Sequence, residues 1–188
     1  MLEKFIKHFK PENDCIKAAP DILAAYKDKI PEELYTLWKV HGFGKYRHGL
    51  IEIINPVDFE PSLWTWLGRE VDNYVPIAIT AFGELFYYRK LTQTDEDICI
   101  VDIQFRNIET LVWSLSEFFD EFLLEADMRE GWLREKLFDQ AYADQGSLNR
   151  HEIFTFAPVF AMGGSAELKY LQKGNAQVYQ NIVFLMTQ

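Results

Sequence analysis

The sequence predicts an α+β fold, in which a mixed, mostly antiparallel sheet with flanking helices is followed by a mainly helical C-terminal part. Residues 75–89 form two apolar runs around Gly83, and the alternation in the first run is typical of a β-hairpin. Apolar residues at helical spacing lie on both sides of this hairpin along the chain. From about residue 114 the apolar period changes from about 2 to about 3.6 residues, which predicts that helices dominate the C-terminal part.

Three short helices are predicted before the hairpin. Apolar residues recur at helical spacing over residues 2–9, and Pro11 ends that segment. Asp21 is a candidate N-cap for a second short helix. Pro31 stands in the first turn of a third helix, which Gly42 terminates.

The hairpin is expected in the middle of the sheet, because residues 85–88 have almost no polar face. Further strands are predicted over residues 50–54, 98–103 and 107–113, and a turn of helix over residues 61–68.

Helical patterns follow the last predicted strand. Ser114 and Glu117 fit a capping box at the start of a helix with one apolar face. A further helix is expected after Gly131, and a final helix over residues 178–186. Residues 161–165 are interpreted as a glycine loop between them.

The chain has 188 residues, which is enough for one large domain or two small ones. The change of period favours two, an α+β domain over residues 1–112 and a C-terminal domain over residues 113–188 that packs on the first. With 48% hydrophobic residues, the composition is that of a globular protein that buries its core without disulfides.

The formal net charge of −10 argues against direct binding to nucleic acid, because phosphate binding needs clustered Lys and Arg. A basic protein is a favourable partner, since opposite charges raise the rate of encounter; the alternative is that acidity only keeps the protein soluble. No Lys or Arg occurs between Arg106 and Arg129. The carboxylates of this interval form either a solvated helix face or a contact patch for a basic partner. They are Glu109, Glu117, Asp120, Glu121, Glu125 and Asp127.

Cysteine usage and hydropathy suit a cytoplasmic protein. Cys15 and Cys99 match no metal-binding or redox spacing, as expected in a reducing compartment. No apolar run approaches the roughly 18 residues of a transmembrane helix. The N-terminus carries charges throughout and does not read as a signal peptide.

No catalytic or metal-binding constellation is recognisable. Ser165 follows two glycines but lies outside any G-x-S-x-G motif, so we interpret it as part of a loop. The four histidines form no i, i+4 pair, and the glycines at 42 and 44 lack the rest of a phosphate-binding motif. We therefore expect no enzymatic activity, no cofactor and no metal.

Three stretches, in this order along the chain, together resemble a known family. They are residues 30–44; Asn55-Pro56 with the Trp64–Trp66 segment and residues 76–86; and residues 160–167 before the last helix. They are similar to the GAD-like (GAD-related) domain joined to the small C-terminal domain of bacterial type VI secretion immunity proteins. The resemblance implies a cytoplasmic antitoxin with an α+β fold and no enzymatic activity, which binds and neutralises a cognate secreted toxin, often a nuclease.

The resemblance supplies no contact residues, because toxin-facing surfaces vary with the toxin. An acidic inhibitor can occupy the basic surface with which a nuclease holds phosphate, so we expect stoichiometric occlusion by carboxylates around a few aromatic anchors. Reversal of residues 95–97 to lysine is expected to weaken toxin binding and to leave the fold intact. The candidate toxin-binding residues are Phe82, Glu84, Asp95, Glu96, Asp97, Asp120 and Glu121.

Two alternatives belong to other functional classes. A small-ligand-binding sensor or regulatory module predicts a partly apolar pocket near Trp64 and Phe86. An enzyme requires a pocket with a perturbed acid–base pair, for which the sequence offers no candidate set. The oligomeric state is left open.

Overall fold

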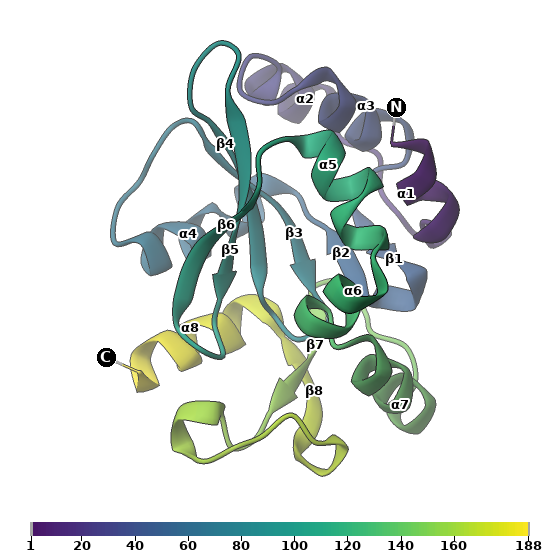
Figure 1. The fold of residues 1–188 in the computed structure, drawn as a ribbon, viewed down its shortest axis with the longest axis vertical. Coiled ribbons are helices and arrows are strands. Elements are labelled where there is room, and N and C mark those ends of the chain that lie inside the picture. Colours follow the sequence, from purple (N-terminus) through teal and green to yellow (C-terminus); the bar gives the residue numbers. More distant parts are fainter. Residues whose placement is uncertain (1, 188) are drawn as a thin grey trace.

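A computed structural model describes residues 2–187 and is organised around one antiparallel sheet (Figure 1). Its six strands lie in the order β1-β2-β3-β4-β5-β6, so every strand pairs with its neighbours in sequence. The predicted α+β class with its sheet is confirmed, and all pairings among the described residues are antiparallel. The strands are β1 (Gly44–Tyr46), β2 (Ile51–Ile53), β3 (Tyr74–Thr80), β4 (Leu85–Lys90), β5 (Glu96–Asp102) and β6 (Asn107–Val112).

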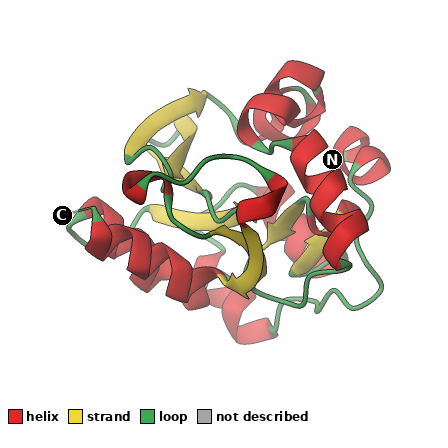
Figure 2. Ribbon diagram, turned by 90° about the horizontal axis from the view of Figure 1, so that it is seen from below, coloured by secondary structure: helices red, strands yellow, loops and turns green. Residues whose placement is uncertain are grey.

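Helices cover both faces of this sheet, as Figure 2 shows from below. One face packs against α1 (Glu3–His8), α2 (Pro20–Tyr26), α3 (Glu32–Val40), α5 (Leu115–Asp120) and α7 (Glu135–Gln145). The other face packs against α4 (Pro56–Leu67) and α8 (Ala176–Met186). Helix α6 (Ala126–Trp132) connects to α7, and four short 3₁₀ turns complete the helical elements: η1 (Arg47–Gly49), η2 (Phe122–Leu124), η3 (Phe160–Met162) and η4 (Leu168–Tyr170).

The central hairpin is β3–β4, as predicted. Side chains of β4 alternate through the sheet, so that Phe86 and Tyr88 enter one apolar cluster while Leu85 and Tyr87 enter the other. All four are at most 3% exposed, which explains why this run carries no polar face. At the turn, Gly83 has φ +98°, a conformation that favours glycine.

A second, two-stranded sheet lies in the C-terminal part, where β7 (Glu152–Phe156) pairs with β8 (Leu171–Asn175). It joins the central hairpin, because the Phe154 amide donates to the Ala81 carbonyl at 2.8 Å. The rings of Phe82 and Phe156 stack with centroids 5.5 Å apart. Both apolar clusters contain residues from before and after position 112. The apolar packing does not separate the chain at this position, so the division into two domains, residues 1–112 and 113–188, stays a prediction.

Several element boundaries differ from the sequence prediction. Helix α2 begins at Pro20 with Ala19 as its N-cap, two residues before the predicted N-cap Asp21, which lies in the first turn. The helix predicted over 61–68 starts at Pro56, because that proline occupies the first turn. The helix predicted after Gly131 is α7, which begins at Glu135 after Arg134 adopts φ +49°; helix α6, which contains Gly131, was not predicted.

Strands β1, β7 and β8 were not predicted, since each is short or lacks clean alternation. The N-cap at Ser114 is confirmed: its hydroxyl accepts the Glu117 amide at 3.1 Å. Within residues 2–187, none of the helices is both long and apolar enough to cross a membrane.

Candidate functional site

A groove lies between the last strand of the sheet, β6, and the helices α5 and α6 that follow it. Its volume is about 420 Å³. The apolar side chains that line it come from both walls: Leu111, Val112, Phe122, Met128 and Trp132. Four carboxylates line it as well: Glu109, Glu117, Glu121 and Glu125. We call this feature the acidic groove.

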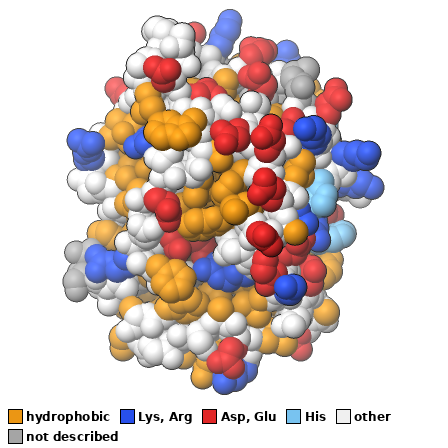
Figure 3. All heavy atoms as spheres, in the orientation of Figure 1, with side chains coloured by type: hydrophobic (Ala, Val, Ile, Leu, Met, Phe, Trp, Pro, Cys, Tyr) orange, Lys and Arg blue, Asp and Glu red, His pale blue; other side chains and the backbone are white. Residues whose placement is uncertain are grey.

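Figure 3 shows the molecule from the same side as Figure 1. Apolar side chains gather in the middle of this face, over the region of β6 and α5, and acidic side chains gather to the right of them. Just outside the groove, Trp113 is 69% exposed, although a large aromatic ring is favourable to bury. This face therefore combines exposed apolar surface with negative charge, the composition expected where a protein partner anchors.

Both walls of the acidic groove come from one interval of the chain, residues 107–132, of which residues 107–128 contain no Lys or Arg. None of the four groove carboxylates forms an ion pair with another described residue. Glu117 accepts the Trp113 amide at 3.2 Å, and Glu109 accepts from the Asn107 side chain. Glu121 and Glu125 accept no side-chain hydrogen bond within residues 2–187, so their charge is free to attract a basic partner.

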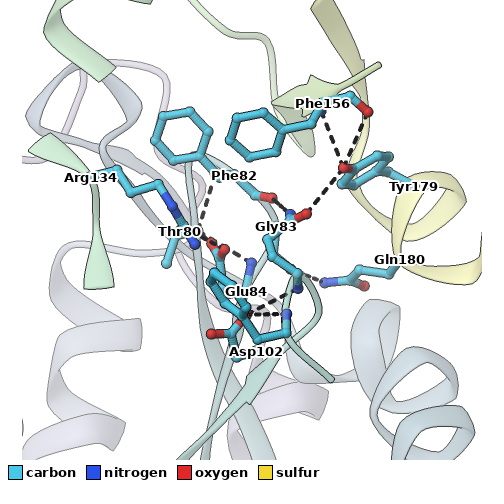
Figure 4. Close-up of polar contacts among 11 residues, drawn as sticks. Thr80, Phe82, Gly83, Glu84, Asp102, Arg134, Phe156, Tyr179 and Gln180 are labelled. Carbon is cyan, nitrogen blue, oxygen red and sulfur yellow. Dashed lines mark hydrogen bonds and ion pairs between the residues drawn. The ribbon is translucent and has the colours of Figure 1, made fainter. Parts of the chain in front are cut away.

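Two predicted candidates, Phe82 and Glu84, lie in the interior at the turn of the central hairpin. Their exposed fractions are 0% and 1%. Glu84 pairs with Arg134, whose Nη1 lies 2.6 Å from Oε1, and it also accepts from Thr80 (Figure 4). The Gln180 amide holds the same turn by donating to the Gly83 carbonyl at 2.9 Å. These contacts connect the hairpin to the C-terminal part, and a partner cannot reach either side chain in this structure.

The three carboxylates of the predicted acidic turn lie in three different environments. Asp95 is exposed and accepts from the Thr92 hydroxyl at 2.7 Å. Glu96 is half-buried and accepts from the Tyr88 hydroxyl and the Leu115 amide, each at 2.9 Å. Asp97 is 0% exposed and accepts from Arg89 Nε at 2.7 Å. The expectation that reversal of all three leaves the fold intact is wrong for Asp97, because lysine there would bury a cation beside Arg89.

Asp120 and Glu121 lie at the C-terminal end of α5. Asp120 is half-buried and accepts the Phe5 amide at 2.9 Å, so it secures the first turn of α1. Glu121 is exposed and lines the acidic groove. Of the predicted candidates, Glu121 alone belongs to the groove, and the other three groove glutamates were noted in the sequence only as members of the acidic run.

Trp64 and Phe86, the side chains expected near the pocket of a small-ligand-binding module, lie on opposite faces of the sheet. Phe86 is fully buried against Phe118 on one face of the sheet, whereas Trp64 packs against the cluster on the opposite face. One pocket cannot be lined by both side chains.

The residues considered for catalysis do not form a site either. Ser165 donates to Glu167 at 2.6 Å, and no histidine is hydrogen-bonded to it among the described residues. Residues 2–187 also contain no group of three metal-ligating side chains.

A hollow of about 270 Å³ lies between α4 and α8, lined in part by Trp66, Gln177 and Gln180. Gln180 is fully buried; its side-chain NH2 donates to the Gly83 carbonyl, while its Oε1 and the Trp66 indole N–H have no hydrogen-bond partner among the described residues. This hollow lacks the unpaired charges of the acidic groove, so the groove is the stronger candidate for a functional surface.

Comparison with known proteins assigns the chain to a family. The model of the GAD-like domain matches residues 1–101, and the model of the C-terminal domain of the type VI secretion immunity protein Tdi1 matches residues 114–187. No curated protein matches the chain. The crystal structure of Atu4351 from Agrobacterium tumefaciens has the same fold, with a TM-score of 0.75 and 16% identity over 98% of this chain and 88% of that one. Because the first match spans more than half of the sequence, the chain belongs to the GAD-like domain family and carries, after it, a domain of the Tdi1 C-terminal immunity type.

Proposed function

We propose that this protein is an immunity protein that binds a cognate secreted toxin and neutralises it by stoichiometric occlusion. The observation that carries the proposal is the match of residues 114–187 to an immunity-protein domain. The acidic groove supports it, because two of its four carboxylates, Glu121 and Glu125, have no ion-pair partner among the described residues. Surplus negative charge beside exposed apolar surface suits a basic protein partner.

The proposed partner is a nuclease toxin. A nuclease holds phosphate groups on a surface rich in Lys and Arg, and an acidic protein can cover the same surface. The net charge of −10 also steers this protein toward such a surface and raises the association rate. In this account the aromatic ring of Trp113 anchors the centre of the contact while carboxylates pair with toxin cations around it.

The test is a titration of this protein against the toxin domain encoded by the neighbouring effector gene, at low and at high salt. We expect nanomolar binding that weakens as salt rises, because the groove charges are exposed and therefore screened. Binding that is equally tight at both salt concentrations would keep the immunity function but move the binding energy to the apolar contacts. Absence of binding at either concentration would contradict the proposal for that pair of proteins.

A further inference from the structure

The two edges of the six-stranded sheet differ in whether their outward-facing backbone groups form hydrogen bonds. At the β1 edge, the chain before α2 lies against the strand. The Glu12 amide donates to the Lys45 carbonyl, and the Arg47 amide donates to the Lys10 carbonyl, each at 2.9 Å. Isolated bridges at Pro11–Tyr46 and Ile16–Phe43 extend this cover. The β1 edge is therefore closed to a further strand.

The β6 edge has no such cover. Strand β6 is the last of the sheet, so its backbone pairs with β5 on one side only. Outside that pairing, no backbone hydrogen bond among residues 2–187 involves residues 107–112. Edge strands are often guarded against pairing by Lys, Pro or a β-bulge. Strand β6 contains neither Lys nor Pro, and its one register shift lies at its end, between Thr110 and Val112. An open edge of six residues is long enough for a strand of a partner protein to pair with it.

The acidic groove lies directly beside this open edge, and the side chains on that side fix the chemistry of the occupant. A strand added at β6 would lie about 4.8 Å away, and alternate side chains of it would point into the groove. There they would meet apolar surface from Leu111, Phe122 and Trp132, and then the groove carboxylates. Lys and Arg fit both features, because their aliphatic stems cover apolar surface while their charged ends reach carboxylates.

We infer that the toxin contributes an extended segment with Lys or Arg at alternate positions, which pairs with β6 and extends the sheet by one strand. This inference rests on the proposed immunity function and adds its mode of recognition. Main-chain hydrogen bonds to β6 supply affinity, and the groove carboxylates select a basic segment over a neutral or acidic one.

The test is backbone hydrogen exchange of this protein, alone and in complex with the toxin domain of the neighbouring effector gene. We expect exchange at the outward-facing amides of residues 107–112 to slow at least tenfold in the complex. The amides of Phe43 and Arg47, on either side of β1, are an internal control, because they already donate to the Ile16 and Lys10 carbonyls of the N-terminal segment in the free protein. On the toxin side, the protected segment should carry Lys or Arg at alternate positions; protection of a segment without them would overturn the assigned chemistry.

Single prolines at residues 107–110, where the register with β5 is regular, provide a second test. Amides of alternate residues point toward β5, so two of the four variants lose a sheet hydrogen bond. The two that keep the wild-type denaturant midpoint carry proline at outward-facing positions, where an edge strand tolerates it. Those two are expected to bind the toxin at least tenfold more weakly.

The outcomes separate this inference from the proposed function. If the wild-type protein binds but the outward-facing prolines bind equally well and no β6 amide is protected, strand addition is overturned while the immunity function stands. If the wild-type protein does not bind, the immunity proposal fails for that pair. If all four proline variants unfold, the exchange measurement on the wild-type complex decides.

Discussion

Two sets of carboxylates in this protein have opposite environments. In the interior, Glu52, Glu84 and Asp97 are each at most 1% exposed, and each lies within 3 Å of a cationic side chain. In the acidic groove, Glu121 and Glu125 are exposed and have no cationic partner among the described residues. The difference follows from solvation: a buried charge requires a partner, whereas water stabilises an exposed one. Only the exposed carboxylates are free to form ion pairs with a partner protein.

Asp102 is an intermediate case that supports this account. It is 6% exposed and has no ion pair, but it accepts the amides of Gln104 and Phe105 at 3.0 and 3.2 Å. Burial and then the charge of Glu84 raise the pKa of Asp102 above its usual value. Without an ion pair of its own, this buried carboxyl is shifted toward its neutral form, although the more distant charge of Arg134 acts against the shift.

The largest expected effect comes from removing the partner of an interior carboxylate. Arg134→Met leaves Glu84 buried without its cation, and we expect the free energy of unfolding to fall by about 3–5 kcal/mol. Urea unfolding monitored by tryptophan fluorescence measures the change. The double variant R134M/E84Q should be more stable than R134M alone, because it removes the unpaired charge. A double variant no more stable than R134M would show that the loss comes from packing around Phe82 instead.

A smaller effect is expected within the acidic turn. Asp97→Asn removes the charge from a buried, bidentate contact with Arg89, and we expect a loss of about 1.5–3 kcal/mol in unfolding free energy. Asp95→Asn, two residues earlier, should change it by less than about 0.5 kcal/mol, because that side chain is exposed. Chemical denaturation of the two variants in parallel measures the difference. Equal losses would mean that exposure does not separate the two carboxylates.

For the groove, the expected change is in binding. Glu121→Lys with Glu125→Lys should lower toxin affinity about tenfold, which is about 1.4 kcal/mol, and mainly by slowing association. The matched control is E70K/D72K, which changes the net charge equally at two exposed carboxylates outside the groove. Surface plasmon resonance gives both rates. Similar losses in both variants would indicate attraction by net charge alone, and the groove would no longer be favoured as the contact surface.

The smallest expected effect is on the pH dependence of the unfolding free energy, and it is confined to acidic pH. Burial alone would raise the pKa of Glu52, but contacts with His151 and Lys45 outweigh it and hold that pKa below its usual value of 4.5. Since the folded-state pKa is depressed, this carboxylate stabilises the fold above pH 4.5, and the contribution is lost as pH falls through the folded-state value. Unfolding free energies between pH 7 and pH 3 should fall less steeply for Glu52→Gln than for wild type. An unchanged slope would assign the acid sensitivity to other groups.

Much of the fold was predictable from local patterns. The alternation around Gly83 identified β3 and β4, and the density of apolar residues in β4 placed that strand in the centre of the sheet. The Ser114 cap marked the start of α5. Strands β7 and β8 were missed because they are stabilised by pairing and by packing on the hairpin, which no local period reveals.

The candidate site was predictable only in part. The absence of Lys and Arg from residues 107–128 was visible in the sequence, and this interval forms both walls of the acidic groove. Exposure was not visible: Phe82, Glu84 and Asp97 were chosen by chemistry and chain position, yet the tertiary structure buries all of them. The sequence alone does not show whether a cationic side chain lies beside a given carboxylate in the folded protein.

By itself, the sequence determined the α+β class, the family, the acidic character and the interval in which negative charge is uncompensated. Those properties depend on composition and on the order of residues, which act locally or sum over the chain. Only the tertiary structure decided which carboxylates are paired, which sheet edge is covered and where the acidic interval folds back on itself as a groove. These depend on contacts between distant segments, such as Glu84 with Arg134 and Lys45 with Glu12, and burial then decides whether a charge stabilises the fold or remains available to a partner.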